Sequence, residues 1–561
     1  MSGATIVRRI GPRLPALPVD SDDARWLGWP LVVGLAVVAL YLATNDYPAY
    51  GAGLYIETAD AVRANGYALP ATVPHYGPKG VPFAYPPLMF YVLAVLRDVG
   101  AGAFVMALYL PPLVTVAALV PTYLLGRDVV GDRRAGTAAA LLVVLHPQVL
   151  EWHISAGGLV RAPAFVFALW GSYAALRLFR DEDREWLLPG LFAVALVAHT
   201  HPTYTVFTVA TYLLFWAGYD RSPAGLVRGA VVGFGALALA LPWLATVVGH
   251  HGVSVFSGAA GTHGGLFGVV YRLREWGPTG ALVPMAAAVG LLRTRHRVLG
   301  AWTVAVWLLF AQPRFTYAVG AITVVAAVVE LAERGYLDGA VALVDRALGH
   351  AGSGPPDRAD GGVARPHVGV ARVVVAALVV LSLVGLGSVG AEFAGAGGTT
   401  PEFVDDADVA AMTWAAEETG PDATFVVLGD AAEWFPVHTD RTILVSPWGA
   451  EWRGPDTYQR HLDAFVNGSE CANRSCAEEA MASVDARPDY VYVPKGAYTV
   501  RGDYEHANDT LESTFAESPR YERVFENEGV VVFRTVTASD RTATGSGRPA
   551  TPRGPRRQPI R

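Results

Sequence analysis

Long apolar runs separated by short, arginine-bearing segments are the feature that most limits how this chain can fold. The first run extends from about residue 26 to 43, and comparable runs recur up to about residue 390. A membrane-spanning helix needs about 20 consecutive apolar residues. Charged residues make up only 17% of the 561 residues, whereas soluble domains contain about 25%. The sequence therefore predicts a polytopic α-helical membrane protein.

Arginine placement predicts the orientation of the spans, because cytoplasmic loops are enriched in Lys and Arg. Arginines precede the first run, so residues 1–25 are expected to be a cytoplasmic segment. The first span is a retained anchor, since no small-residue cleavage site follows it. Alternating sides gives about eleven spans within a transmembrane domain of residues 26–395, with a first external loop over 44–101 and a last span near 371–390. The arginine-bearing segments that then fall inside are 126–136, 178–186, 219–229, 293–297 and 333–372.

Residues 396–537 are predicted to form one extracytoplasmic α/β domain. Apolar, strand-like runs alternate there with helical patterns such as 404–418. The strand-like runs are 423–429, 442–447, 489–494 and 529–536. Between Thr400 and Val536 there are 26 acidic and 10 basic residues, a balance typical of proteins from salt-loving sources such as haloarchaea. The Pro-rich, basic end of the chain predicts a disordered tail over 538–561.

Two cysteines and three N-glycosylation sequons lie in this polar region. The sequons begin at Asn467, Asn473 and Asn508, and such acceptors are modified only on the exported side of a membrane. Cys471 and Cys476 are the only cysteines in the chain. On the oxidising side they are expected to form a disulfide. The alternative is a metal-binding pair, which needs two more ligands that are not evident nearby.

Ionisable residues at the outward ends of the spans are the expected site of chemistry, because such residues are costly next to lipid. Several arginines there oppose the positive-inside trend. A bound lipid phosphate would explain them, since guanidinium groups match phosphate oxygens geometrically. For any single arginine, the alternative is an ion pair or snorkelling to the interface. The predicted phosphate- or substrate-binding residues are Lys79, Tyr85, His153, Arg161, His199, His201, Arg272, Arg274 and Arg314.

The segment GVPFAYPPLMFY, residues 80–91, combines aromatic residues with three prolines. Pro86 and Pro87 push the preceding backbone toward extended geometry, so a helix is expected to begin at about Pro87 and to end near Arg97. Such a helix is too short to span a bilayer. It is predicted to lie at the membrane interface.

An N-terminal span, a long acidic first loop, the YPPL segment, many further spans and an exported α/β domain together resemble the C-type (GT-C) integral-membrane glycosyltransferases. This family includes protein O-mannosyltransferases, aminoarabinose transferases and oligosaccharyltransferase catalytic subunits, and the resemblance covers about residues 26–335. It implies transfer of a sugar from a polyprenyl (dolichyl) phosphate donor to a glycan, lipid or protein acceptor outside the cell membrane. Some relatives use a divalent metal and others need none, so the metal requirement stays open.

The catalytic carboxylates that the resemblance implies are missing from their usual place. Many family members carry an acidic pair four residues before a helix tyrosine. Aligning that tyrosine with Tyr55 puts Gly51 and Ala52 at the acidic positions. An acceptor hydroxyl or amide still needs a base, and the catalytic candidates in the first loop are Asp46, Glu57 and Asp60. The alternatives are that Asp46 caps a turn and that Asp60 pairs with Arg63.

The sequence as a whole predicts a membrane glycosyltransferase with no certain cofactor. The alternative is a non-catalytic GT-C-like protein that binds polyprenyl lipid or scaffolds surface-glycan assembly, and the missing acidic pair favours it. A secondary transporter is disfavoured because no two-fold repeat is evident, and the net charge of −7 disfavours nucleic acid as a partner. No metal site is assigned, since Pro202 makes the His199–His201 stretch a turn.

Overall fold

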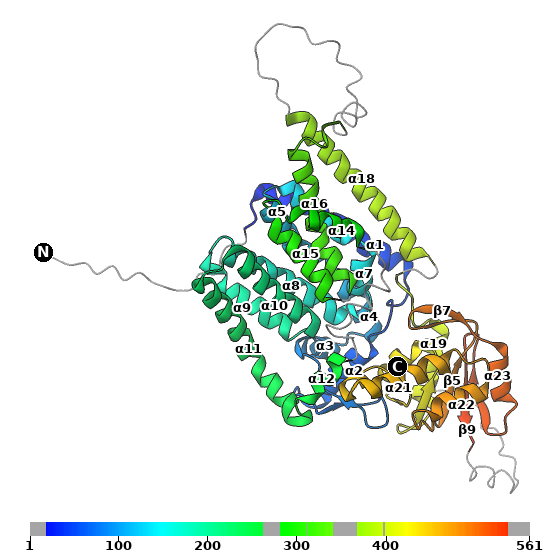
Figure 1. The fold of residues 1–561 in the computed structure, drawn as a ribbon. Helices are drawn as coiled ribbons and strands as arrows, with labels where there is room; N and C mark the ends of the chain where they lie inside the picture. Colours follow the sequence, from blue (N-terminus) through cyan, green and yellow to red (C-terminus); the bar gives the residue numbers. More distant parts are fainter. Residues whose placement is uncertain (1–17, 262–280, 311, 340–366, 396–398, 537–561) are drawn as a thin grey trace, which may run out of the picture.

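The computed structural model describes residues 18–261, 281–310, 312–339, 367–395 and 399–536. Figure 1 shows them as a helical part joined to a smaller, sheet-containing part. The whole predicted tail, together with Arg272 and Arg274, lies outside the described residues. The helices of the helical part are α1 (Ser21–Thr44), α4 (Ala103–Ala117), α5 (Leu119–Val130), α6 (Arg133–Val144), α7 (Pro147–Ile154), α8 (Gly158–Phe179), α9 (Leu187–Ala198), α10 (Pro202–Tyr219), α11 (Pro223–His251), α12 (Ser254–Gly261), α14 (Leu282–Leu291), α15 (Arg297–Leu309), α16 (Pro313–Glu333) and α18 (His367–Ala394).

Six helices of the described part, with α4 and α5 counted as one, are long and apolar enough to cross a membrane. These segments are Ser21–Thr44, Ala103–Val130, Gly158–Phe179, Pro223–His251, Pro313–Glu333 and Val373–Ala394. The apolar helices α14 and α15 fall short of the about 20 residues that a straight span needs. The chain is therefore a polytopic helical membrane protein, as predicted, while the count of about eleven spans stays a prediction.

The first helix begins earlier than the apolar run that predicted it. α1 starts at Ser21 because the Asp20 carboxylate accepts from the backbone N–H groups of Asp22 and Asp23, and the Asp23 carboxylate accepts from the N–H of Asp20. This capping box satisfies N–H groups that a helix start leaves unpaired. The predicted boundary at residue 25 consequently falls inside a helix.

The first loop contains the short helix predicted after the YPPL prolines, while its place at a membrane interface stays a prediction. Its elements are α2 (Gly53–Ala64), β1 (Thr72–Val73), β2 (Val81–Pro82) and α3 (Leu88–Asp98). α3 starts directly after Pro87. It buries Phe90 and Leu93 against the protein and leaves Val92 and Val95 exposed. An uncovered apolar face is what a helix needs to rest at a membrane interface.

The sheet-containing part carries a five-stranded sheet of order β4-β3-β5-β9-β8. Its strands are β3 (Thr424–Val427), β4 (Thr442–Ile443), β5 (Tyr490–Pro494), β8 (Tyr521–Glu526) and β9 (Val530–Thr535), beside a hairpin of β6 (Ala497–Val500) and β7 (Asp503–His506). Its helices are α19 (Asp406–Glu418), α20 (Ala431–Thr439), η2 (Ala450–Arg453), α21 (Pro455–Ser469), α22 (Arg474–Ala482) and α23 (Asp509–Ala516). β4, β3 and β5 run parallel, and β9 and β8 are antiparallel to their neighbours. Four strands lie within predicted runs, whereas β8 was missed because its sequence, YERVFE, is half charged.

The first loop and the sheet-containing part share one hydrophobic core. Buried Ile56 of α2 and Phe425 of β3 belong to the same cluster. The backbone N–H of Gly77 donates to the carbonyl of Ile443 over 2.8 Å. We call this contact of α2, β1 and β2 with α20 and β4 the seam. Core packing and backbone hydrogen bonds therefore hold the first loop against the sheet-containing part. We call these two parts together, residues 44–101 and 399–536, the roof.

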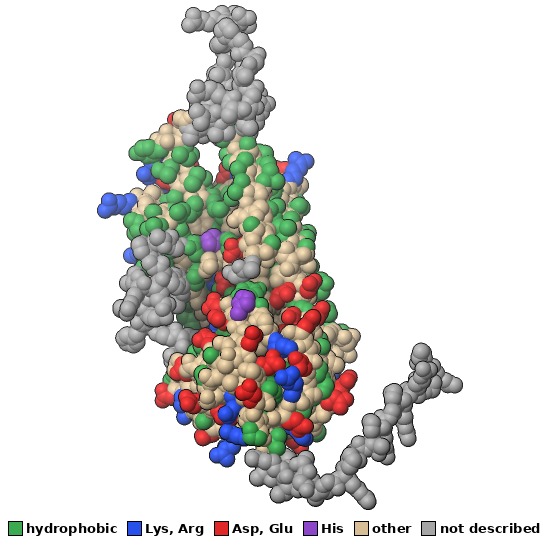
Figure 2. Space-filling view, turned by 90° about the vertical axis from the view of Figure 1, so that its right-hand side faces the viewer, with side chains coloured by type: hydrophobic (Ala, Val, Ile, Leu, Met, Phe, Trp, Pro, Cys, Tyr) green, Lys and Arg blue, Asp and Glu red, His purple; other side chains and the backbone are tan. Residues whose placement is uncertain are grey.

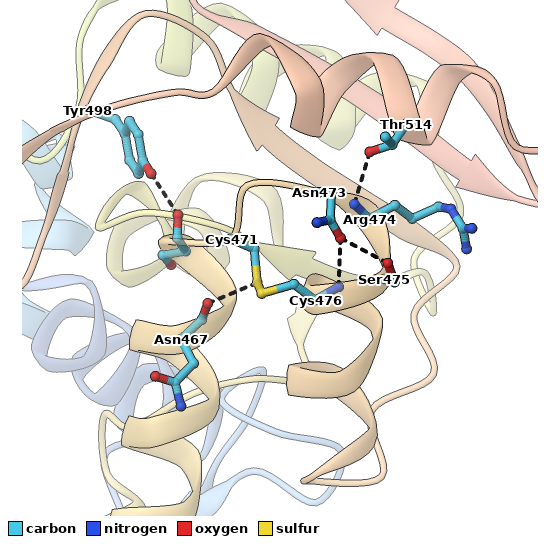
Figure 3. The surroundings of a disulfide bond; sticks show 9 residues. Asn467, Cys471, Asn473, Arg474, Ser475, Cys476, Tyr498 and Thr514 are labelled. Carbon is cyan, nitrogen blue, oxygen red and sulfur yellow. Dashed lines mark hydrogen bonds between the residues drawn. A yellow bond between two sulfur atoms is a disulfide. The ribbon is translucent and has the colours of Figure 1, made fainter.

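Charged side chains gather on the sheet-containing part, and apolar side chains cover the helices (Figure 2). A disulfide joins Cys471 to Cys476 between α21 and α22, with the two Cα atoms 5.6 Å apart (Figure 3). The side chain of Asn473 caps α22 by accepting from the N–H of Cys476 over 3.1 Å. Asn467 and Asn508 are exposed. Glycosylation of the three asparagines stays a prediction.

Candidate functional site

Two arginines from different helices meet over one tryptophan beneath the roof. Arg161 lies in the first turn of α8 and Arg314 in the first turn of α16. Their guanidinium carbons are 5.1 Å and 5.4 Å from the ring centroid of Trp152. Neither has an ion-pair partner among the described residues, and the Nε atom of Arg314, a residue only 4% exposed, has no hydrogen-bond partner. We call Arg161 and Arg314 the arginine pair.

Arginines at the opposite end of the helical part are neutralised instead. A pocket of about 1030 Å³ there is lined by charged residues of α1, α5, α6 and α8. Four of its five arginines pair with carboxylates, as Arg127 does with Asp23 over 2.8 Å and Arg180 with Asp181 over 2.8 Å. The fifth, Arg134, lies over the ring of Trp26. The contrast indicates that the arginine pair lacks the direct carboxylate contact that a buried guanidinium normally has.

A wall of aromatic rings lines the space beside the arginine pair. The ring of Tyr85 lies 5.6 Å from Tyr55 and 5.7 Å from His201, and His201 lies 5.0 Å from Tyr204. Tyr204 in turn lies 5.6 Å from the Arg314 guanidinium carbon. The structure thus brings together four residues that the sequence predicted for substrate binding: Tyr85, Arg161, His201 and Arg314.

Three other residues predicted to bind substrate, His153, His199 and Lys79, do not belong to the aromatic wall or to the arginine pair. His153 is fully buried, its Nδ1–H donates to the Val149 carbonyl over 2.5 Å, and its Nε2 accepts from the Tyr204 hydroxyl over 2.6 Å. With both nitrogens occupied, His153 orients Tyr204 and has none left for a phosphate. The Nδ1–H of His199 donates to the carbonyl of Ala195, four residues earlier. Lys79 is exposed on the first loop.

The three carboxylates predicted from the first loop do not reach the arginine pair. Asp46 is exposed in the turn after α1. Asp60 forms ion pairs with Arg63 over 2.7 Å and with Arg97 over 3.1 Å, which matches the alternative reading of that residue. Glu57 is buried and bonded to a histidine of the same loop.

A carboxylate from the sheet-containing part occupies the place that the first loop leaves open. Glu433 in α20 is only 9% exposed, and a Cβ added at Gly51 would overlap its carboxylate. Burial raises the pKa of Glu433 to about 8, helped by the negative charge of Asp430 and opposed by the positive charge of Arg161. Glu433 therefore holds a proton at neutral pH and can exchange it near pH 8.

A second carboxylate, Glu151 of α7, lies one residue before the tryptophan that carries the arginine pair. Its Oε1 accepts from the hydroxyl of Tyr50 over 2.9 Å, and the Tyr50 ring stacks on Trp152 at 5.8 Å. Glu151 is not among the catalytic or binding residues predicted from the sequence. No sequence signal pointed to Glu433, because the approach to Gly51 depends on how the seam closes.

Some aromatic residues in and near α20 pack in the hydrophobic core, and others lie at the candidate site. Trp434 is fully buried, and its Nε1–H donates to the carbonyl of Tyr50 over 3.2 Å. His438 stacks on Phe104 at 4.1 Å. Trp452 alone of this group reaches the aromatic wall, with its ring 6.1 Å from Tyr85. Trp434 therefore belongs to the core of the sheet-containing part, and Trp452 to the aromatic wall.

Comparisons with known proteins bear on the fold only. No protein-family model matches the chain, and no curated protein matches it. Among solved structures, the chain resembles the crystal structure of ArnT from Cupriavidus metallidurans bound to undecaprenyl phosphate. The identity is 14%, the match covers 91% of this chain and 98% of that one, and the TM-score is 0.49. An overlap at this level decides nothing about activity.

Proposed function

We propose that this chain is a membrane glycosyltransferase that moves a sugar from a polyprenyl-phosphate donor to an acceptor on the extracytoplasmic face. The observation that carries the proposal is the arginine pair, which lies under the roof with no carboxylate partner among the described residues. A cation that is shielded from water and lacks a counter-ion is costly. A lipid phosphate entering from the bilayer would supply the missing negative charge and accept guanidinium hydrogen bonds.

The placement of the arginines also gives the proposed orientation of the chain in the membrane. The proposal places the roof and the arginine pair outside the cell, with about eleven spans in residues 26–395 and an exported α/β domain over 396–537. The neutralised arginines of the opposite end then face the cytoplasm, in line with the positive-inside trend.

The reaction needs three groups, and the site offers each of them. The acceptor oxygen forms a bond to the anomeric carbon of the sugar, the bond from that carbon to the phosphate oxygen breaks, and its electron pair leaves with the phosphate. Arg161 and Arg314 stabilise the charge that develops on the phosphate. Glu433 takes the acceptor proton, since it is the buried carboxyl beside Gly51 whose pKa of about 8 lies near working pH. Rings of the aromatic wall, such as Tyr85, give the sugar apolar faces to stack on.

A non-catalytic lipid-binding protein is the second candidate function. The observation that favours it is Glu433 itself, which is protonated at neutral pH and therefore a poor base there. In this reading the arginine pair holds the polyprenyl phosphate, and no bond to the sugar breaks.

Complementation of a deletion strain separates these two functions. Arg161→Gln and Arg314→Gln are expected to abolish both the binding of dolichyl phosphate to purified protein and the recovery of the strain's glycan profile. Arg97→Gln is the control, because Arg97 is paired with Asp60 on the loop surface, and it should retain both properties. A glycan profile that is unchanged by the deletion, together with retained lipid binding, would favour the non-catalytic reading.

A further inference from the structure

A second group of ligand-type side chains lies in the seam, apart from the arginine pair. Glu57, His75 and Asp440 each offer one donor atom, and these atoms all lie within 4.8 Å of one another. The Oε1 atom of Glu57 is 2.8 Å from the Nδ1 atom of His75. Glu57 is buried, His75 is half-buried and Asp440 is exposed, so the group opens to solvent on one side.

The three side chains come from three separate elements that the seam holds in place. Glu57 lies on α2, His75 follows β1, and Asp440 ends α20. The N–H of Ile443 donates to the carbonyl of His75 over 2.9 Å, and the N–H of Asp440 donates to the carbonyl of Pro436 over 2.8 Å. Because backbone hydrogen bonds fix both sides of the seam, the donor atoms are positioned before any ligand arrives.

The charge of this group is unbalanced. Two carboxylates lie close together, and in the described part of the chain the Asp440 carboxylate has no hydrogen-bond or ion-pair partner. The nearest arginine in sequence, Arg441, is turned away, because its guanidinium donates to the carbonyl of Thr439 over 2.8 Å and to that of Thr419 over 2.8 Å. Like charges at this separation repel unless a cation lies between them.

We propose that Glu57, His75 and Asp440 bind a divalent transition-metal ion that clamps the first loop to the sheet-containing part. One imidazole nitrogen and two carboxylate oxygens form a donor set that suits Zn²⁺ or Mn²⁺, with water completing the coordination, whereas Mg²⁺ and Ca²⁺ prefer oxygen alone. The ion joins α2 to the end of α20. Its role is structural, because neither the arginine pair nor Glu433 is among the three side chains that hold it.

The clamp has a consequence for the geometry of the candidate site. α2 also carries Tyr55 of the aromatic wall, and α20 carries Glu433 near its start. A Cβ added at Gly53 would overlap the backbone carbonyl of Glu433, so the two helices already touch without a spacer. An ion at the far end of this contact would keep the helices from sliding.

Zinc binding to the purified full-length chain, stripped of metal by a chelator, tests the proposal. We expect one equivalent of Zn²⁺ by titration calorimetry, and a higher unfolding temperature on adding Zn²⁺. His75→Ala should weaken binding by at least about 100-fold, since loss of even an outer partner of a metal site costs about 10–100-fold. Asp440→Asn should weaken binding by at least about tenfold. Because Asp440 is exposed, this variant tests the site even where the histidine variant does not fold.

Two controls exclude other zinc ligands. His250 and His251, adjacent at the end of α11, have ring centroids 5.9 Å apart, and the double alanine variant should bind as the wild type does. Asp60→Asn, on the same helix as Glu57, should also leave binding unchanged. Absence of binding at millimolar Zn²⁺, or binding that only the His250/His251 variant removes, would overturn the proposal and leave Glu57 and His75 as an ion pair.

Discussion

The protonation of Glu433 makes a quantitative prediction for the proposed reaction. With a pKa of about 8, this carboxyl is about 9% ionised at pH 7, half ionised at pH 8 and about 90% ionised at pH 9. A base must be ionised to accept the acceptor's proton. We therefore expect kcat/KM to rise about tenfold between pH 7 and pH 9 and then to level off.

Membranes of a deletion strain that expresses each variant supply the native donor and acceptor for this assay. Glu433→Gln keeps the size of the side chain and removes its charge, so the rate should fall by about 10²–10⁴ and lose its rise with pH. Gly51→Ala should act in the same direction, because the new methyl group would displace the carboxylate of Glu433. In the Glu433→Gln background, Gly51→Ala should have little further effect.

A matched control is Asp408, a half-buried carboxyl of the sheet-containing part whose pKa desolvation raises to about 7. It accepts from the hydroxyl of Tyr492, away from the arginine pair. Asp408→Asn should keep the rise in rate between pH 7 and pH 9. A rate that is flat over this range in the wild type, or an unchanged profile in Glu433→Gln, would refute Glu433 as the base.

Three further predictions concern stability. Gly53→Ala should lower the free energy of unfolding by about 1–3 kcal/mol, since the added Cβ meets the backbone of Glu433, and chemical unfolding at equal expression would show it. Asp408 holds its proton more tightly folded than unfolded, so its contribution to stability is full below pH 4 and is lost as the pH rises toward 7; Asp408→Asn should flatten unfolding curves over that range. Unreduced protein should show no alkylation of Cys471 or Cys476, and serine at both positions should cost about 2 kcal/mol in chemical unfolding.

Local signals predicted much of the fold. Pro87 fixes where α3 begins, because proline tolerates the first turn of a helix and disfavours helix before it. The apolar runs gave four of the five strands of the main sheet, since buried parallel strands are continuous hydrophobic segments. β8 escaped prediction because half of its residues are charged and they break any apolar run or alternation. The short helices α14 and α15 show the limit of hydropathy, which finds apolar segments without deciding whether each one crosses the bilayer.

The candidate site was predictable in its arginines and in Tyr85 and His201 of the aromatic wall, but not in its carboxylates. Arg161 and Arg314 stood out because arginine is unusual at the outer ends of spans. The carboxylates were a different case, since helical spacing puts Glu57 and Asp60 on neighbouring faces of α2 without deciding which face meets the arginine pair. The packing of α2 against α20 and α3 determines where each carboxylate points. Glu57 is hydrogen-bonded to His75, and Asp60 forms an ion pair with Arg97.

The close approach of Glu433 accounts for the glycine at position 51. A residue with a Cβ at position 51 would overlap the Glu433 carboxylate, so the first loop carries glycine where the sheet-containing part inserts its side chain. The carboxyl group at this point is therefore supplied by α20 of the sheet-containing part and not by the first loop. The proposed base is carried by α20 and comes into place only when the seam closes, so closing of the seam is a condition for the proposed reaction as well as for stability. A carboxylate on the first loop would have carried no such condition. Variants that loosen the seam without touching Glu433 should therefore lower the transfer rate before they lower expression.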